Sequence, residues 1–222
     1  MAQPQYRDST KASTEGAMTL DIAYPTFTSG DLAILFCVND SSANTWTTPA
    51  GWSVGHANYQ MAGQHDFIWF YKTLTTESGN LTVEWADSAA TILVMAAINP
   101  NGATITISDE DINDGAANPH TGPTVTGVAD CILLVAMAMD SGSAITVPPA
   151  DMTAMQNKVD LGAGTVAIYT GYELRGAGDV SKSITWGADD STIGVAVVLA
   201  DSGGSGGTSI LTQLASHQRR RA

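Results

Sequence analysis

The sequence predicts an all-β protein: a jelly-roll-like β-sandwich built from an internal duplication of about 100 residues, followed by a short C-terminal arm. Three observations lead to this prediction. The chain is rich in glycine, with 22 among 222 residues, and only 14% of its residues are charged. Its apolar residues come in short runs separated by turn-forming residues. Most of these runs also occur twice, at an offset of about 100 residues.

The repeat leaves almost no insertion or deletion between the two halves. The turn "TTPAGW" returns as "VPPADM", and Trp85 is matched by Trp186. The matched segments are 30–38 with 129–137, 47–52 with 147–152, 67–74 with 167–174, 81–87 with 183–189, and 90–98 with 191–199. The regions that we expect are a polar N-terminal segment at 1–17, a duplicated sandwich at 18–202 with halves at about 18–100 and 118–202, and a Gly/Ser linker with a basic arm at 203–222.

Each half contains about five strand candidates. The runs "ILFCV" (34–38) and "TILVMAAI" (91–98) are apolar throughout, as is typical of central strands covered on both faces. The segment "LTVEW" (81–85) alternates between apolar and polar residues. Two arrangements remain open: each half closes as its own immunoglobulin-like sandwich, or both halves share one core. Residues 99–123 contain the strand-like "ATITIS" rather than a plain linker, which favours the shared core.

Charge excludes some classes of partner. Residues 1–202 hold 22 acidic against six basic residues, a net charge of −16, so we expect no binding to nucleic acid or to an anionic membrane. No apolar run approaches the about 20 residues that a membrane helix needs. The start of the chain does not resemble a secretory signal, and the two cysteines lie in apolar runs. We expect a soluble intracellular product with buried free thiols.

The acidic stretch "SDEDINDG" resembles part of a calcium loop. Asp109, Asp111 and Asn113 have the spacing of its first three ligands. Asp114 stands where such a loop has glycine, and His120 stands where it has glutamate, so a solvated acidic loop is the preferred interpretation. The sequence has no zinc, phosphate-loop, dinucleotide or nucleophile-elbow pattern. We expect no cofactor and no catalytic residue.

Two parts of the chain are candidates for contact with a partner. Trp46 lies in the loop "SSANTWTTPAGW", whereas Trp69 and Trp85 fall in patterns typical of a core, so Trp46 is a candidate surface contact. The arm "TSILTQLASHQRRRA" would carry an apolar side and a basic end on a short helix, and a frayed tail is the alternative. The partner-binding residues that we expect in the arm are Ile210, Leu211, Leu214, Arg219, Arg220 and Arg221.

The pattern "GDLAILFCVND…TPAGW…FIWFYKTL…LTVEWADSAATILVMAAI" resembles a β-sandwich family of structural proteins in tailed phages, also seen in some bacterial surface proteins. The resemblance covers about residues 18–200, in both halves, and leaves out residues 203–222. Its motifs are architectural, so they bear on the fold more firmly than on the role. In the second half Asp151 and Met152 replace the Gly-Trp of the turn, which weakens the case for a shared surface there.

The resemblance implies a non-catalytic virion component, and we expect a capsid decoration, or cement, protein. Its partners would be the major capsid protein and neighbouring copies of itself, as a homo-oligomer on a virion made in the host bacterial cytoplasm. Many copies on a lattice would make weak individual contacts effective. One rival hypothesis is a tail-fibre or surface adhesin module that binds glycans near Trp46. A glycoside-cleaving enzyme is another, but the sequence offers no pair of carboxylates for it.

Overall fold

In the described part of this computed structural model, all regular secondary structure is β-strand, so the all-β prediction is confirmed. The structure describes residues 3–41, 44–61, 65–140, 144–160, 166–187 and 191–202. The strands are β1 (Gln5–Ala23), β2 (Leu32–Asn39), β3 (Trp46–Thr47), β4 (Ser53–Met61), β5 (His65–Thr73), β6 (Asn80–Asn99), β7 (Ile105–Gly115), β8 (His120–Thr121), β9 (Val125–Gly127), β10 (Cys131–Met139), β11 (Ile145–Val147), β12 (Thr153–Asp160), β13 (Ala167–Arg175), β14 (Gly178–Val180), β15 (Ser183–Trp186) and β16 (Thr192–Asp201).

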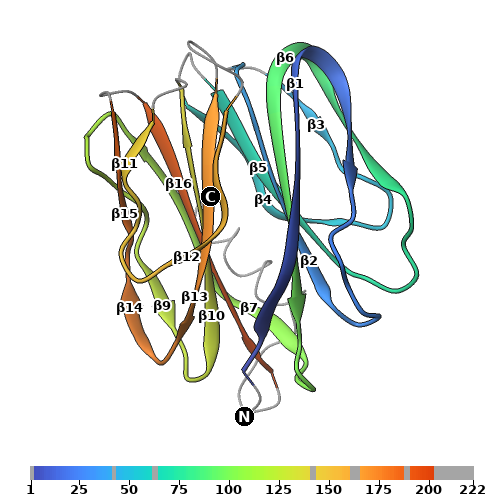
Figure 1. Ribbon diagram of the computed structural model, residues 1–222, viewed down its shortest axis with the longest axis vertical. Helices are drawn as coiled ribbons and strands as arrows, with labels where there is room; N and C mark the ends of the chain where they lie inside the picture. The colour runs from blue at the N-terminus through green and yellow to red at the C-terminus, as the bar shows by residue number, and fades with distance from the viewer. Residues whose placement is uncertain are drawn as a thin grey trace.

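Two large antiparallel sheets form the centre of the molecule (Figure 1). The first sheet has the order β1-β6-β2-β5-β4, with β3 paired to β6, and it comes entirely from the first half of the chain. The second sheet has the order β7-β16-β10-β13-β12 and comes from the second half. The two orders match strand for strand. Two small sheets, β11-β15-β8 and β14-β9, complete the second half.

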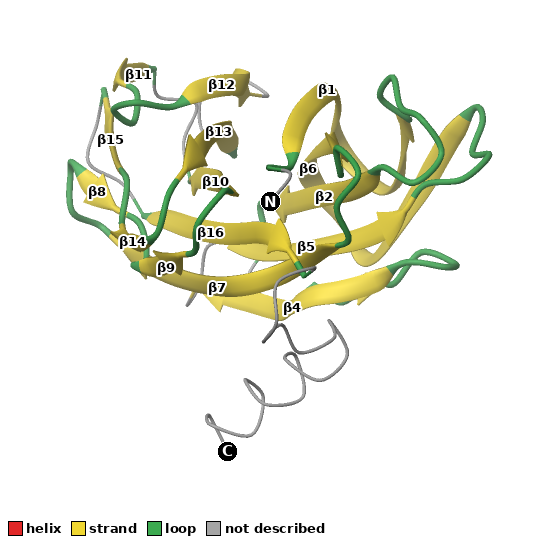
Figure 2. Cartoon of the chain, turned by 90° about the horizontal axis from the view of Figure 1, so that it is seen from below, coloured by secondary structure: helices red, strands yellow, loops and turns green. Residues whose placement is uncertain are grey.

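The two large sheets face each other across a core that both halves supply (Figure 2). Alternate side chains of each strand point into this shared core, because successive side chains of a strand point to opposite faces. The first sheet contributes Leu32, Ile34, Phe36, Val38, Phe67, Trp69, Tyr71, Ile92, Val94, Ala96 and Ile98. The second contributes Ile105, Ile107, Ile112, Ile132, Leu134, Ala136, Ala138, Met155, Val166, Ile168, Ile193, Val195, Val197 and Leu199.

The opposite face of each large sheet is covered by an outer layer from the same half. In the first half this layer includes Trp46, Trp85 and the Trp52 turn, which pack on Leu35 and Phe70. In the second half, Val125, Val180, Ile184 and Trp186 pack on Leu133, Val135 and Tyr169. Each half therefore has an apolar core of its own, and the two halves share a third core. Both cysteines are free and buried.

The N-terminal boundary expected from the sequence falls inside a strand. β1 begins at Gln5 and pairs with β6 from Gln5–Asn99 to Ala23–Asn80, so most of the expected polar segment at 1–17 belongs to the first sheet. β7 takes the same place in the second sheet, so the stretch between the halves is itself an edge strand. Polar residues at a sheet edge discourage pairing with other chains, which explains why neither segment has the apolar pattern of a central strand.

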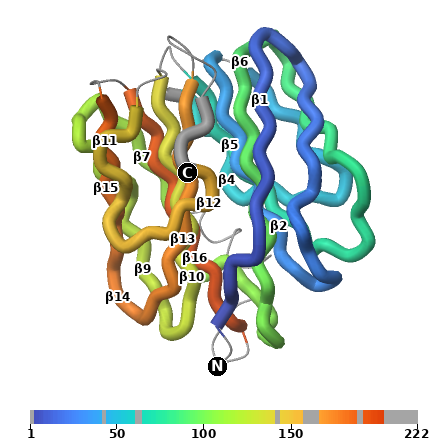
Figure 3. The backbone as a smooth tube through the Cα atoms, in the orientation of Figure 1, coloured from blue at the N-terminus to red at the C-terminus, as the bar shows by residue number. Residues whose placement is uncertain are grey.

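The halves meet along two seams, in each of which an edge strand of one large sheet lies against an edge strand of the other. β1 lies beside β12 (Figure 3), where Gln156 Nε2 donates to Ser9 Oγ at 3.0 Å. At the other seam, Nδ1 of His56 in β4 lies 3.0 Å from a carboxylate oxygen of Glu110 in β7. Tyr6 and Tyr172 stack with ring centroids 4.5 Å apart, and this contact extends the first seam.

One packing contact in the first sheet depends on a glycine. A Cβ atom at Gly55 would lie 2.2 Å from the Trp69 ring, so only glycine lets this ring lie across β4. In the second sheet, Thr170 occupies the place of Trp69, and Met155 fills the shared core beside it. The same space is thus filled from β5 in one half and from β12 in the other.

We expect Gly55→Ala to lower the free energy of unfolding by about 1–3 kcal/mol, because the added methyl group overlaps the buried Trp69 ring. Urea unfolding followed by tryptophan fluorescence measures this change. Gly176→Ala is the matched control, since a Cβ atom there meets no heavy atom within 4 Å and its backbone needs no positive φ. Equal losses in both variants would contradict the packing explanation.

Candidate functional site

Trp46 does not form a surface contact, so this expectation is corrected. Trp46 is only 7% exposed and its ring centroid lies 5.4 Å from that of Trp85, its partner in the β3–β6 pairing. The short β3 strand turns the indole inward, over the outer face of the first sheet. A glycan platform at this position would need the opposite orientation.

The calcium-loop spacing of Asp109, Asp111 and Asn113 falls on a strand rather than on a loop, so this weak metal assignment and the preferred loop interpretation are both corrected. All three lie in β7, where five consecutive residues extend over about 13 Å and cannot wrap around one ion. Their side chains are engaged locally: Asp109 accepts from the Thr126 N–H at 2.7 Å, and Asn113 donates to the Thr121 carbonyl at 3.0 Å. Within the described ranges, no group of three or more His, Cys, Asp or Glu residues is arranged to hold a metal.

The arm residues expected to bind a partner, at positions 210, 211, 214 and 219–221, lie outside the described residues. A search of the described part of the chain for a helix long and apolar enough to span a membrane finds none.

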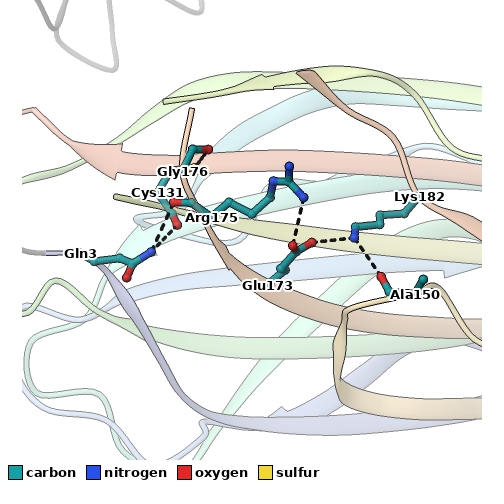
Figure 4. A network of polar contacts seen from close by, with 7 residues as sticks. All are labelled: Gln3, Cys131, Ala150, Glu173, Arg175, Gly176 and Lys182. Atoms are coloured by element: carbon teal, nitrogen blue, oxygen red, sulfur yellow. Dashed lines mark hydrogen bonds and ion pairs between the residues drawn. The ribbon is translucent and has the colours of Figure 1, made fainter. Parts of the chain in front are cut away.

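An ion pair lies beside the repeated turn in each half, with the charges exchanged at the matching strand position. Both turns place a residue at positive φ, Gly51 at 77° and Asp151 at 61°. In the first half, Lys72 on β5 lies over Gly51 and contacts Glu77 at 2.8 Å. In the second half, the matching strand position carries Glu173 (Figure 4), and its partner Lys182 comes from the outer layer. The matching strand position thus carries a basic residue in one half and an acidic residue in the other.

The Glu173 carboxylate is the centre of a small network (Figure 4). Lys182 Nζ lies 2.6 Å from one of its oxygens and also donates to the Ala150 carbonyl at 2.8 Å, which fixes the turn. Arg175 donates to the other oxygen at 2.9 Å. Beside Arg175, Gln3 donates to the Cys131 carbonyl at 3.0 Å and so ties the N-terminus to the second sheet. Every charge in this network has a partner, which indicates a structural role.

A different group of polar side chains is buried at one end of the first sheet. Asp66 of β5, Asn39 of β2 and Thr91 of β6 are adjacent in the register and fully buried. In the second sheet Met139 takes the place of Asn39, and Ala167 takes that of Asp66. The same fold is therefore built with apolar residues at these two positions.

Asp66 is held by neutral donors. Its Oδ2 accepts from the Asn44 N–H at 2.6 Å, and the Asn58 side chain also donates to the carboxylate. Burial raises the pKa of Asp66 to about 6 despite these hydrogen bonds. Asn44 also bonds Asp87 through both atoms of its amide, so it links the β2–β3 connection to β6.

Sequence reasoning missed the Asn39–Asp66 cluster, although a signal was present. Both residues adjoin strongly apolar runs, and the matched segments of the two halves, extended by one residue, set them against the apolar Ala138 and Val166. A polar-to-apolar difference within otherwise similar core strands marks a position where one half carries something that the fold itself does not require.

Comparisons with known proteins identify no relative: no family model, no curated protein and no solved structure matches the chain.

We expect the free energy of unfolding to fall as pH rises from about 4 to about 6, with Asp66 contributing up to about 3 kcal/mol. In this window folded Asp66 still holds its proton, whereas the unfolded carboxyl has released it, so a higher pH favours the unfolded chain. Asp66→Asn should remove this fall, measured by urea unfolding across the pH range in buffer without divalent cations. The exposed Asp151→Asn should leave it unchanged, and an unaltered slope in the Asp66 variant would contradict the assignment.

We expect Lys182→Met to cost about 1–3 kcal/mol of stability, because it strips a partner from the largely buried Glu173. The corresponding Lys72→Met should cost less than about 1 kcal/mol, since the Lys72 side chain is 24% exposed against 8% for Lys182. Chemical denaturation of both variants gives the comparison. A larger loss for the Lys72 variant would show that burial does not set the strength of these pairs.

Proposed function

We propose that this chain is a non-catalytic structural component of a tailed-phage virion, most consistent with a capsid decoration protein. The observation that carries the proposal is that the motif residues are buried and pack inside the fold. The buried Asp31 of the Gly-Asp-Leu strand is bound by Arg7 and by the Thr28 N–H, and Trp52 of the turn packs in the first-half core. Trp85 and Trp186 are buried in their respective halves. The motif residues therefore serve to stabilise the fold.

The proposal includes the origin of the fold: duplication of a jelly-roll-like unit of about 100 residues, followed by exchange of residues at matching contacts. The identical strand order of the two large sheets supports this origin. A pair of equivalent aspartate contacts also supports it. Asp8 accepts from the Thr26 N–H at 2.7 Å, and Asp109 accepts from the Thr126 N–H at 2.7 Å, each between the edge strand and the segment before the central strand.

The body and the arm would have different tasks on the virion. Three fused apolar cores give a rigid body, and its net charge of −16 over residues 1–202 favours solubility and weighs against contact with the packaged genome. The arm at 203–222 carries three arginines and no acidic residue, so it would attach the body to an acidic patch on the major capsid protein or on a neighbouring copy.

Deletion of residues 203–222 tests the proposal directly. Full-length and truncated proteins are added to capsids of the encoding phage that lack the chain, and bound protein is measured after sedimentation. We expect full-length protein to bind in regular copy number and the truncated protein to lose at least ten-fold in affinity. Substitution of Arg219, Arg220 and Arg221 by glutamine should weaken binding and reduce its dependence on salt.

Three outcomes separate the competing functions. Full binding by the truncated protein would remove the arm from the mechanism while keeping the virion role. Absence of both proteins from capsids would overturn the decoration role. Specific binding on a glycan array, with no binding to capsids, would instead favour the adhesin hypothesis.

A further inference from the structure

The buried cluster at Asp66 forms a row across three strands. Asn39 is the register partner of both Asp66 and Thr91, and the three residues belong to neighbouring strands about 4.8 Å apart. All three are fully buried. Asn58 of β4 lies beside Asp66, because its amide donates both to the Asp66 carboxylate and to the Asn44 carbonyl, the latter at 2.8 Å.

Several oxygen atoms of this cluster have no hydrogen-bond partner. Oδ1 of Asp66, Oδ1 of Asn58 and both polar atoms of Asn39 are buried and unpaired. Buried polar atoms in folded proteins are rarely left in this state. Asn39 and Asp66 are cross-strand neighbours, yet the polar side-chain atoms of Asn39 form no hydrogen bond with the Asp66 carboxylate.

Among the residues that the structure describes, no basic side chain pairs with Asp66. Its protein contacts are the Asn44 N–H and the Asn58 amide, which are both neutral. By contrast, the largely buried Glu77 and Glu173 are each paired with lysine. Buried carboxylates without a basic partner commonly coordinate a metal ion.

The fold itself does not demand these groups. Met139 and Ala167 fill the corresponding positions of the second sheet and leave no polar atom there. The first half therefore retains a carboxylate and an amide at a site where an apolar pair completes the same sheet.

We propose that Asp66, Asn39 and Asn58 bind a hard metal cation through their side-chain oxygens, and that Ca²⁺ is the ion that fits best. Carboxylate and amide oxygens are typical Ca²⁺ ligands, and Ca²⁺ tolerates irregular geometry, whereas Mg²⁺ demands a near-ideal octahedron. A bound ion would link β2, β4 and β5 at the end where Asn44 anchors the β2–β3 connection to β6. The site is independent of the proposed virion role.

The test uses the full chain, dialysed against a chelator and then titrated with CaCl₂ at neutral pH. We expect about one Ca²⁺ per chain by isothermal titration calorimetry and a rise of about 4 °C in Tm at 1 mM Ca²⁺. MgCl₂ at the same concentration should raise Tm by less than half as much. Asp66→Asn should abolish both the binding heat and the Tm rise.

A second variant guards against a trivial loss of folding. Asn39→Met combined with Asp66→Ala installs the residues that complete the second sheet, so it should fold and show no response to Ca²⁺. Asp109→Asn removes a carboxylate from the acidic β7 strand and should keep the full response. The proposal is overturned if the wild-type Tm does not respond to Ca²⁺, or if the Asp66 variants respond as strongly as the wild type, since binding would then lie elsewhere.

Discussion

The apolar face shared by the two large sheets is the contact on which the rest of the structure depends. Each central strand packs against the other half with one set of alternate side chains and against its own outer layer with the other set. β2 and β10 therefore bury every residue along their lengths. Because neither face of these strands meets water, their sequences are continuously apolar rather than alternating, apart from Asn39 at the end of β2. A half on its own would expose one whole face of its large sheet.

The two halves preserve contacts more closely than they preserve residues. Gly55 and Trp69 fill the space that Met155 and Thr170 fill on the other side, with the bulk moved from one strand to its neighbour. An ion pair lies beside the repeated turn in both halves, with lysine at the strand position of the first half and glutamate at the matching position of the second. Close packing constrains the summed volume and charge of a contact, and it leaves open which strand supplies them.

The halves differ in kind at the Asp66 cluster. In the Glu173 network, the buried carboxylate is balanced by basic partners from the same half. No basic residue of the described ranges pairs with Asp66, and burial of its carboxylate raises its pKa. A rigid scaffold that serves in an assembly gains from fixing the ends of its strands, and an ion bound at this end would serve that purpose in the half that carries it.

The sequence by itself indicated an all-β chain of short apolar strands separated by turns, because apolar periodicity and turn chemistry are local properties. It also marked Trp85, Trp186 and both cysteines as core residues. Only the tertiary structure decided that β1 and β7 are edge strands, that Trp46 faces inward, and that Asp109, Asp111 and Asn113 lie along an extended strand. These outcomes, like the neighbours of Asp66, depend on which segments meet across the sheets. Spacing along a chain does not specify such contacts, since they join residues far apart in sequence.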